Sequence, residues 1–181
     1  MKKLCCLLAA VTFLTGCDNG GLLNTPTKKV EMFLANYQTL DADVLEQLDD
    51  VVDATESFDD DQKDTYREIM KKHYKNITYE VKDEIIDGDT AIVTTEIEVT
   101  DYSKVISEAD TYKEENEKEF MNDAGEYDEK LFIDYRLNKL KEAKDTVKYT
   151  IDFTLTKVED EWKLDHLTDE QENKIHGLYS Y

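Results

Sequence analysis

The chain is poor in cysteine, proline and glycine, and these shortages narrow the classes of protein to which it can belong. Its three cysteines, Cys5, Cys6 and Cys17, lie in the first 17 residues, so the remainder has no thiol for a disulfide, a metal site or a nucleophile. Its six glycines stand at positions 16, 20, 21, 88, 125 and 177, too dispersed to form a phosphate-binding loop. No Gly-x-Ser-x-Gly motif of a serine hydrolase is present either.

Basic residues are also scarce, since 22 Lys and Arg stand against 43 Asp and Glu, which gives a formal net charge of −21. This balance argues strongly against nucleic acid as a partner, because nucleic-acid-binding surfaces need clustered Lys and Arg. It also argues against direct attraction to an anionic bilayer. We expect a solvated acidic surface, which could in addition attract cations or basic partners.

The first 17 residues have the layout of an export signal. Lys2 and Lys3 form a short positive region, and residues 4–14 form an apolar run that is too short to span a bilayer. Small residues follow at Thr15 and Gly16, directly before Cys17. This three-part order predicts export across a membrane.

The stretch Leu14-Thr15-Gly16-Cys17 resembles the lipobox of bacterial lipoproteins, which has an aliphatic residue, two small residues and an obligatory cysteine. The resemblance implies that the thiol of Cys17 receives a diacylglyceryl group and that the signal is cleaved between Gly16 and Cys17. Each buried methylene contributes about 0.8 kcal/mol, so two or more acyl chains hold a protein at a bilayer. The alternative is an ordinary signal peptide in which Cys17 is coincidental.

The same resemblance implies a division of the chain into three parts. Residues 1–16 are the signal peptide, residues 17–25 are a lipidated tether, and residues 26–181 are one domain. It also implies a position at the cell membrane, outside the cytoplasm, with the lipid on Cys17 as the membrane contact.

The N-terminal part of the domain has helical periodicity. Thr25 and Pro26 predict a helix start, Asp43 with Glu46 predicts a capping box, and residues 59–61 predict a third helix start. The three apolar stripes are Val30, Phe33, Leu34, Tyr37; then Val44, Leu45, Leu48, Val51, Val52; then Tyr66, Ile69, Met70, Tyr74.

Two β-hairpins are predicted after the helices by alternating apolar residues. The first covers residues 77–99 with its turn at Asp87-Gly88, and the second covers residues 147–166 with its turn at residues 158–161. Trp162, Leu164 and His166 share one face of the last strand. Between the hairpins we expect a helix after Asp101, with its charged stretch 113–119 projecting into solvent, a break at residues 122–125, and a second helix after Asp128. A capping box at Thr168 and Gln171 predicts a short C-terminal helix.

This order predicts the α+β class, with N-terminal helices packed on a curved antiparallel four-stranded sheet made of two hairpins that a long helical segment separates. It resembles the cystatin-like or nuclear-transport-factor-2-like cone, which also occurs in small lipoproteins of unknown function from low-GC Gram-positive bacteria. The residues that carry the likeness are the helix 30–37, the hairpin 77–99 and the hairpin 147–164. The long helical segment departs from the compact enzymes of that group. Such folds host enzymes, binders and scaffolds alike.

A pocket inside the cone is the candidate site, and its candidate lining residues are Tyr37, Tyr79, Tyr149, Phe153, Trp162 and His166. The alternative is that these side chains simply fill the core. No catalytic residue, cofactor or metal is assigned. His166, Asp169 and His176 have no known metal-ligand spacing, and they are more simply a rim histidine and an exposed tail histidine. The acids at 59, 60, 61 and 64 lack the glycine and the terminal glutamate of a calcium loop.

Three functions remain open. The first is a non-enzymatic binding or interaction module for an unknown protein or small molecule. The second is an enzyme of the ketosteroid-isomerase or polyketide-cyclase type, which would need His166 opposite Tyr149 or Tyr79 as an acid–base pair. The third is an envelope adaptor that makes its contact through residues 113–119.

Overall fold

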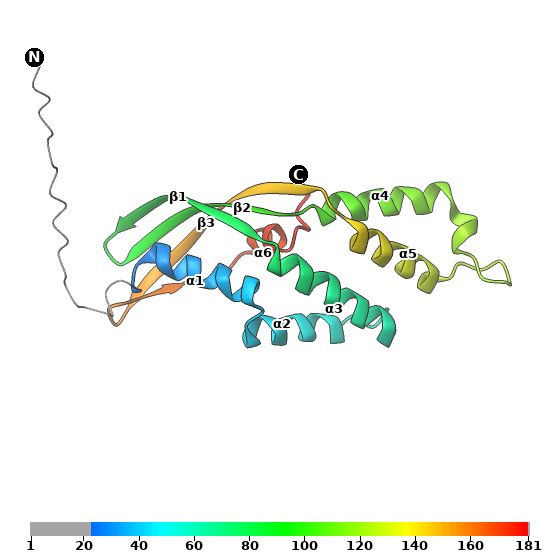
Figure 1. The fold of residues 1–181 in the computed structure, drawn as a ribbon, viewed down its shortest axis with the longest axis horizontal. Helices are drawn as coiled ribbons and strands as arrows, with labels where there is room; N and C mark the ends of the chain where they lie inside the picture. Colours follow the sequence, from blue (N-terminus) through cyan, green and yellow to red (C-terminus); the bar gives the residue numbers. More distant parts are fainter. Residues whose placement is uncertain (1–22, 181) are drawn as a thin grey trace, which may run out of the picture.

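A computed structural model describes residues 23–180, and over this range the protein is an α+β domain (Figure 1). Its elements are α1 (Pro26–Thr39), α2 (Ala42–Asp53), α3 (Asp60–Lys75), β1 (Thr78–Asp87), β2 (Thr90–Thr100), α4 (Tyr102–Glu115), the 3-10 helix η1 (Glu117–Phe120), α5 (Glu129–Glu142), β3 (Thr146–Val158), β4 (Glu161–Leu164) and α6 (Asp169–Ile175). The predicted α+β order, with two hairpins separated by a helical segment, is confirmed. The predicted signal, its cleavage point and Cys17 lie outside the described residues.

The four strands form one antiparallel sheet in the order β1-β2-β3-β4. The first hairpin turns directly after the paired residues Asp87 and Thr90, and Gly88 in the turn has φ of 59°, which glycine adopts without strain. β2 and β3 pair over the whole of β2 and thereby join the two hairpins. The predicted four-stranded sheet therefore includes a central pairing between its two hairpins.

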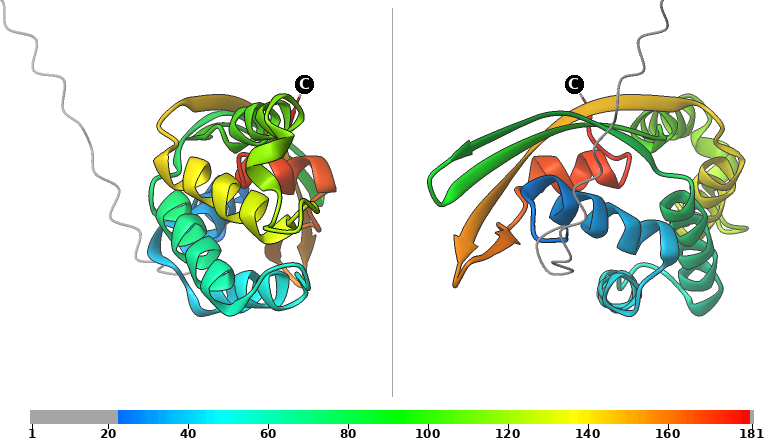
Figure 2. Two further views of the ribbon diagram at one scale, coloured as in Figure 1. Left: turned by 90° about the vertical axis from the view of Figure 1, so that its right-hand side faces the viewer. Right: turned by 60° about the vertical axis from the view of Figure 1, so that its left-hand side comes forward.

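The sheet arches over α1 and α6, and α2 and α3 extend the helical layer (Figures 1 and 2). Helices α4 and α5 lie side by side and project from the end of the molecule opposite to the start of the described chain. We call residues 102–142 the arm and the rest of the described chain the body. The body therefore has two layers, sheet and helices, and the arm extends beyond them.

Alternation along β2 and β3 builds the core of the body. Every second residue of β2 from Ala91 to Val99 is buried, and so is every second residue of β3 from Tyr149 to Leu155. The opposite face carries polar pairs, such as Lys148 Nζ with Glu96 Oε1 at 2.9 Å. One face of the sheet is thus dry and the other wet, as alternation predicts for an antiparallel sheet.

The last strand is shorter than predicted. β4 ends at Leu164, so His166 is not on its face but in the exposed segment that leads to α6. Where β4 stops, other groups cover the edge of β3: Asp165 N, Gln171 Nε2 and Lys174 Nζ donate to backbone carbonyl oxygens of Thr154, Asp152 and Thr150. The segment after β4 therefore replaces the rest of a fourth strand.

Five of the predicted helix starts are confirmed, because N-capping follows a local rule. A backbone N–H in the first turn of the following helix donates to the side chain of each cap residue: Thr25, Asp59, Asp101, Asp128 and Thr168. The predicted capping box at Asp43 is wrong. Helix α2 begins two residues earlier, and the side chain of Asp41 accepts from Asp43 N at 3.1 Å.

The break within the arm comes earlier than residues 122–125. Helix α4 ends at Glu115, because Asn116 leaves helical geometry and its side chain donates to Tyr112 O at 2.9 Å. The 3-10 helix η1 follows and buries Phe120. The charged stretch 113–119 is thus not one projecting helix but a helix end and a turn.

Strand β1 has a bulge between Val81 and Asp83, and its distal half is exposed. At the same end of the molecule, Asn24 joins the start of the described chain to the second hairpin, since it donates to Asp160 O and accepts from Trp162 N. No helix among residues 23–180 is both long enough and apolar enough to cross a membrane.

Candidate ligand-binding cavities around helix α3

Three cavities surround helix α3 and share lining residues. The α3–α5 groove has a volume of about 460 Å³, the tyrosine cavity about 250 Å³ and the central cavity about 210 Å³. Ile69 lines both the groove and the central cavity, and Met70 lines both the central cavity and the tyrosine cavity. Helix α3 therefore separates these cavities, with Ile69 and Met70 in the walls between them. The three cavities together form the candidate site.

The tyrosine cavity is lined from three sides by aromatic residues. Tyr66, Met70 and Tyr74 follow each other at four-residue spacing on one face of α3, Tyr37 comes from α1, and His176 follows α6. The rings of Tyr37 and Tyr74 are 5.0 Å apart in an edge-to-face arrangement. The hydroxyl of Tyr74 lies 3.2 Å from Nδ1 of His176.

Tyr37, Tyr74 and His176 in this cavity are neutral at physiological pH, whereas Glu172 adds a carboxylate to the lining. Burial raises the pKa of Tyr37 to about 12, with help from the negative charge of Glu172, and burial also raises the pKa of Tyr74. Burial lowers the pKa of His176 to about 4, and neighbouring His73 adds to this. Apolar walls with a few neutral donors and acceptors suit an uncharged or amphipathic small molecule.

His73 lies within α3 and lines the α3–α5 groove, and it has a structural role. It is 1% exposed, and its Nε2 donates to the carbonyl oxygen of Ile175 at 2.9 Å. Burial lowers the pKa of His73 to about 4, so the ring is neutral and Nδ1 is an acceptor. Within the described part of the chain Nδ1 has no hydrogen-bond donor. His73 thus ties α3 to the C-terminal segment.

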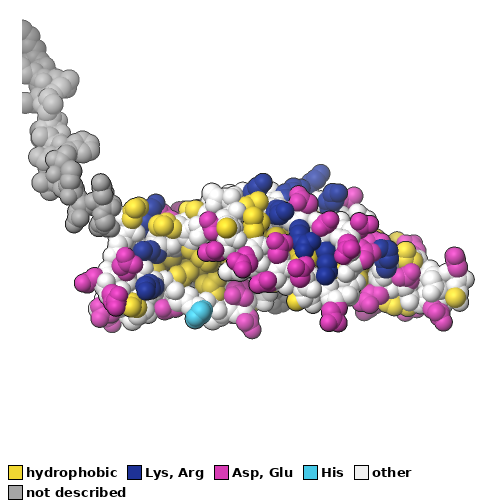
Figure 3. All heavy atoms as spheres, turned by 90° about the horizontal axis from the view of Figure 1, so that it is seen from below, with side chains coloured by type: hydrophobic (Ala, Val, Ile, Leu, Met, Phe, Trp, Pro, Cys, Tyr) yellow, Lys and Arg dark blue, Asp and Glu magenta, His cyan; other side chains and the backbone are white. Residues whose placement is uncertain are grey.

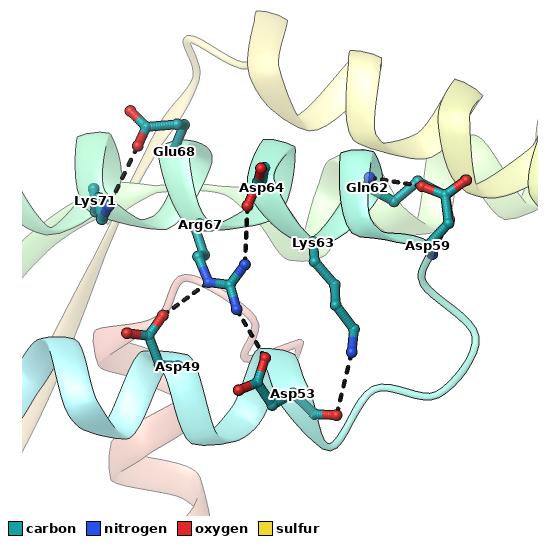
Figure 4. Close-up of polar contacts among 9 residues, drawn as sticks. All are labelled: Asp49, Asp53, Asp59, Gln62, Lys63, Asp64, Arg67, Glu68 and Lys71. Atoms are coloured by element: carbon teal, nitrogen blue, oxygen red, sulfur yellow. Dashed lines mark hydrogen bonds and ion pairs between the residues drawn. The ribbon is translucent and has the colours of Figure 1, made fainter.

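The wall that α2 contributes is held in place by Arg67 (Figure 4). The guanidinium of Arg67 contacts three carboxylates, with 2.8 Å to Asp49 and Asp53 of α2 and 3.0 Å to Asp64 of α3. In the same view, Lys63 reaches the carbonyl oxygen of Asp53 at the end of α2. A single exposed ion pair contributes little, but a forked guanidinium shared by two helices fixes their register.

The α3–α5 groove has an apolar floor and a charged rim. Ile69, Tyr102 and Leu140 form the floor, and Glu68, Lys72 and Lys141 are among the rim residues. Burial raises the pKa of Tyr102 to about 12. Buried Gln62 donates to Asp134 Oδ1 at 2.7 Å and so joins α3 to α5.

The six predicted pocket residues do not share one of these cavities. Tyr37 lines the tyrosine cavity, and Tyr149 lines a separate hollow of about 340 Å³ beside Ser103. Phe153 is fully buried, with its ring 5.9 Å from that of Phe33. Trp162 is buried as well, and Tyr79 is half-buried. A common pocket for the six stays a prediction, and the cavities around α3 do not bring two of them together.

The predicted acid–base pair of His166 with Tyr149 or Tyr79 finds no support among the described residues. His166 is exposed, the hydroxyl of Tyr149 donates to Tyr179 O at 2.7 Å, and that of Tyr79 lies 3.5 Å from Glu31 O. The expectation that His176 is an exposed tail histidine is wrong, because this side chain packs against tyrosine rings. No group of His, Cys, Asp and Glu with metal-binding geometry occurs among the described residues.

Sequence reasoning found Tyr66, Met70 and Tyr74 but assigned them to packing only. Their spacing marks an inward face of a helix, and a filled core and a lined cavity give the same spacing. His73 and His176 had no local signal, because their contacts join positions about 100 residues apart in the chain.

Acidic side chains are spread over the surface of the domain. Figure 3 shows Asp and Glu side chains along the whole length of one face, with Lys and Arg side chains among them and apolar side chains gathered toward the end where the described chain begins. This distribution agrees with the net charge of −21 and with the expected solvated acidic surface.

Comparison with known proteins does not assign the chain to a family. No protein-family model matches the chain, and no curated protein matches it. A search of solved structures finds ycdA, a candidate lipoprotein from Bacillus subtilis subsp. subtilis str. 168, with 16% sequence identity and a TM-score of 0.46. The match covers 76% of this chain and 46% of that one, so the chain spans about half the length of ycdA. An overlap this loose supports no conclusion about fold or function.

Proposed function

We propose that the protein is a lipoprotein anchored outside the cytoplasm, and that its domain is a non-enzymatic binding module for a small, mainly apolar ligand. The single observation that carries the anchor is the sequence Leu14-Thr15-Gly16-Cys17 after a short apolar run. The thiol of Cys17 takes the diacylglyceryl group, and cleavage after Gly16 leaves it as the first residue.

The anchor is tested by metabolic labelling with an alkyne-bearing palmitate in a bacterial host. We expect labelled protein in the membrane fraction, and a Cys17→Ala variant that is unlabelled and loses its cleavage. Cys6→Ala is the matched control, because Cys6 lies inside the proposed signal and should leave both labelling and cleavage intact. A wild-type protein that takes up no label, or a Cys17→Ala variant labelled as strongly as wild type, contradicts the proposal.

The binding role is supported by the adjoining cavities around α3. The tyrosine cavity and the central cavity are lined mainly by aromatic and aliphatic residues, and the Tyr74 hydroxyl and the His176 imidazole are neutral polar groups 3.2 Å apart. Cavities of a few hundred Å³ with this lining suit a small ligand that buries most of its surface. The ligand would place an apolar body against Met70 and Tyr66 and a hydroxyl or amide group toward His176.

The binding role is tested with a neutral fluorescent probe, N-phenyl-1-naphthylamine, and by mass spectrometry of small molecules that copurify with the protein. Met70→Trp adds volume where the central and tyrosine cavities meet, and we expect it to weaken probe binding about tenfold. Met32→Trp is the matched control, because Met32 on α1 is 46% exposed and lines none of the three cavities. Equal binding by wild type and Met70→Trp overturns this role.

The alternative of a ketosteroid-isomerase-like enzyme has less support. Such an enzyme needs a histidine or carboxylate whose pKa is adjusted opposite a tyrosine donor. The candidate base, His166, is exposed, and the hydroxyls of Tyr149 and Tyr79 face backbone carbonyl oxygens instead. We therefore assign no catalytic residue.

We also infer that the body is a variant of the cystatin-like or nuclear-transport-factor-2-like cone. The support is that the sheet arches over α1 (Figure 2). An experimental structure tests this inference, since a flat sheet with α1 packed at its edge would contradict it.

A further inference from the structure

The two long edges of the sheet differ in what covers them. The edge of β3 is covered beyond β4 by donors from the segment that contains α6. The edge of β1 has no such cover among residues 23–180. Apart from its ladder with β2, the backbone of residues 83–87 makes two hydrogen bonds, from Glu84 N to Asp83 Oδ1 and from Thr90 Oγ1 to Asp87 O. An uncovered strand edge is a template for pairing with another chain.

The direction of the free backbone groups follows from Glu84. Its N–H donates to the carboxylate of Asp83 at 2.9 Å and not to β2, so it points out of the sheet edge. Backbone groups alternate in direction along an antiparallel strand, so the N–H and C=O of Ile86 point the same way. Neither group of Ile86 has a partner among the described residues. The distal half of β1 thus offers a donor and an acceptor in the plane of the sheet.

Apolar side chains flank this open backbone on both faces of the hairpin. Ile85 is 58% exposed and Ile86 is 52% exposed, and successive residues of a strand point to opposite faces. Ile92 lies directly opposite Ile85 on β2 and is also exposed. An added strand would therefore find an apolar neighbour on either face.

The charge of the region identifies the kind of partner. Asp83, Glu84 and Asp87 lie on this half-strand and Asp89 lies in the turn, and none of them has an ion pair in the described structure. A second copy of the chain would place the same acids opposite each other. An anionic bilayer would be repelled in the same way.

The geometry points to residues 83–87 of β1 as a docking edge for an extended, basic segment of a partner protein, in which Lys or Arg alternates with Val or Ile. The segment adds a strand to the sheet by pairing with the backbone of Ile86, buries Ile85 and Ile86, and neutralises Asp83 and Asp87. The bulge at Val81/Asp83 limits the docking edge on one side and the turn limits it on the other. This site is independent of the lipid anchor and of the cavities around α3.

The test uses the full-length protein in detergent micelles and the fluorescent peptide Lys-Val-Lys-Val-Lys-Val-Lys, followed by fluorescence anisotropy. Two comparison peptides replace lysine with glutamate or carry N-methyl groups on alternate backbone nitrogens. We expect the basic peptide to bind at least about tenfold more tightly than either comparison peptide. Equal binding by the acidic peptide removes the charge argument, and equal binding by the N-methylated peptide removes strand pairing, so either result overturns the proposal.

The matched variants are Ile86→Pro and Ile86→Thr. Proline removes the outward N–H and is tolerated on an edge strand, whereas threonine keeps the N–H and β-branched shape. We expect Ile86→Pro to lose about tenfold in peptide affinity and Ile86→Thr to lose less than about threefold. Wild-type affinity in a folded Ile86→Pro protein overturns the proposal, and so does self-association of wild type that Ile86→Pro abolishes. The N-methylated peptide decides the question without any variant, even where Ile86→Pro does not fold.

Discussion

The body of the domain and the distal half of the arm are both stabilised by buried apolar side chains, but the two clusters differ in reach. The body cluster joins residues from the sheet and from α1, α2, α3 and α6, and it also includes the arm residues nearest the body, Tyr102, Ile133, Leu137 and Leu140. The distal cluster consists of Ala109, Phe120 and Phe132, with Tyr112 and Tyr135 packed against it. All of its members come from one stretch of about 30 residues. The body should therefore unfold as one unit, whereas the distal arm can open alone.

The distal cluster is small, and ring stacking and cation–π contacts add to its stability. The rings of Tyr112 and Tyr135 stack at 4.9 Å and 13°, and Lys113 Nζ lies 4.6 Å from the ring centre of Phe132. The charged stretch 113–119, expected to be a solvated face, thus contributes a cation that covers an aromatic ring. A small core closed by charged side chains depends more on ionic strength than the body core does.

The largest expected effect lies in the centre of the body. Phe153 is fully buried, and its ring packs edge-to-face against that of Phe33. Phe153→Ala leaves a cavity that the rigid sheet cannot fill, so we expect the free energy of unfolding to fall by about 3–5 kcal/mol. Urea unfolding followed by circular dichroism measures this loss. A loss below about 1 kcal/mol would show that the body is not the tightly packed unit described here.

The next effect tests the attachment of the C-terminal segment to the body. Gly177 has φ of 69°, and a Cβ at this position would lie 2.1 Å from Thr100 O. We expect Gly177→Ala to lower the free energy of unfolding by roughly 2–4 kcal/mol, because both the backbone angle and the close approach oppose a side chain. Gly125→Ala is the control: it has φ of 77° but open space around its Cβ position, so its loss should be smaller and confined to the arm. Equal losses in the two variants would remove the close approach as a cause.

Histidine titration gives the third effect, again in the body. The pKa of His73 is about 4 in the folded protein and 6.5 as its ordinary value, so the unfolded chain binds the proton more readily. Stability from this group is complete above pH 6.5 and declines as the pH falls from 6.5 to about 4, by up to about 3 kcal/mol. His176, whose pKa is also about 4, adds to the decline over the same range.

The measurement is the midpoint of urea unfolding at a series of pH values from about 7 to about 4. His73→Gln should flatten the slope between pH 6.5 and 4, although it is less stable at pH 7. Exposed His166→Gln is the control and should keep the wild-type slope. An unchanged slope in His73→Gln would mean that His73 is not the titrating group.

The features that sequence reasoning found are those governed by neighbouring residues. The caps at Thr25, Asp59 and Thr168, the turn at Gly88 and the alternation of β2 and β3 follow rules that act within a few positions. The α+β class followed from their order. The cap of α2 was predicted two residues too late. Asp41 and Asp43 both fit the capping rule, and only the packing of the helix selects Asp41.

The features that sequence reasoning missed depend on contacts between distant positions. The short β4, the cover of the β3 edge and the burial of His176 all depend on where the C-terminal segment docks. The candidate site was missed for a second reason. Tyr66, Met70 and Tyr74 form an inward stripe whether the space beside them is filled or empty, so periodicity cannot reveal a cavity.

The smallest effect on global stability should come from a substitution in the arm. This substitution tests most directly whether the arm and the body unfold separately. Phe120 is the centre of the distal cluster and contacts the rings of Phe132 and Tyr135 at 5.4 and 5.5 Å. In the body, a Phe→Ala substitution lowers the free energy of unfolding by several kcal/mol. In the arm, the loss in global unfolding is smaller, because the arm can open locally before the body unfolds. We therefore expect Phe120→Ala to change the unfolding midpoint of the body by the equivalent of about 1 kcal/mol or less.

The readout for Phe120→Ala is amide hydrogen exchange along the whole chain. Exchange should accelerate by about tenfold or more in residues 107–135 and stay at wild-type rates in β2 and β3. Tyr127→Ala, at an exposed position of the same arm, is the matched control and should leave both regions unchanged. If exchange in β2 and β3 accelerates together with the arm, the two clusters form one cooperative unit. The arm would then be a rigid extension of the body, because its opening would cost the whole fold.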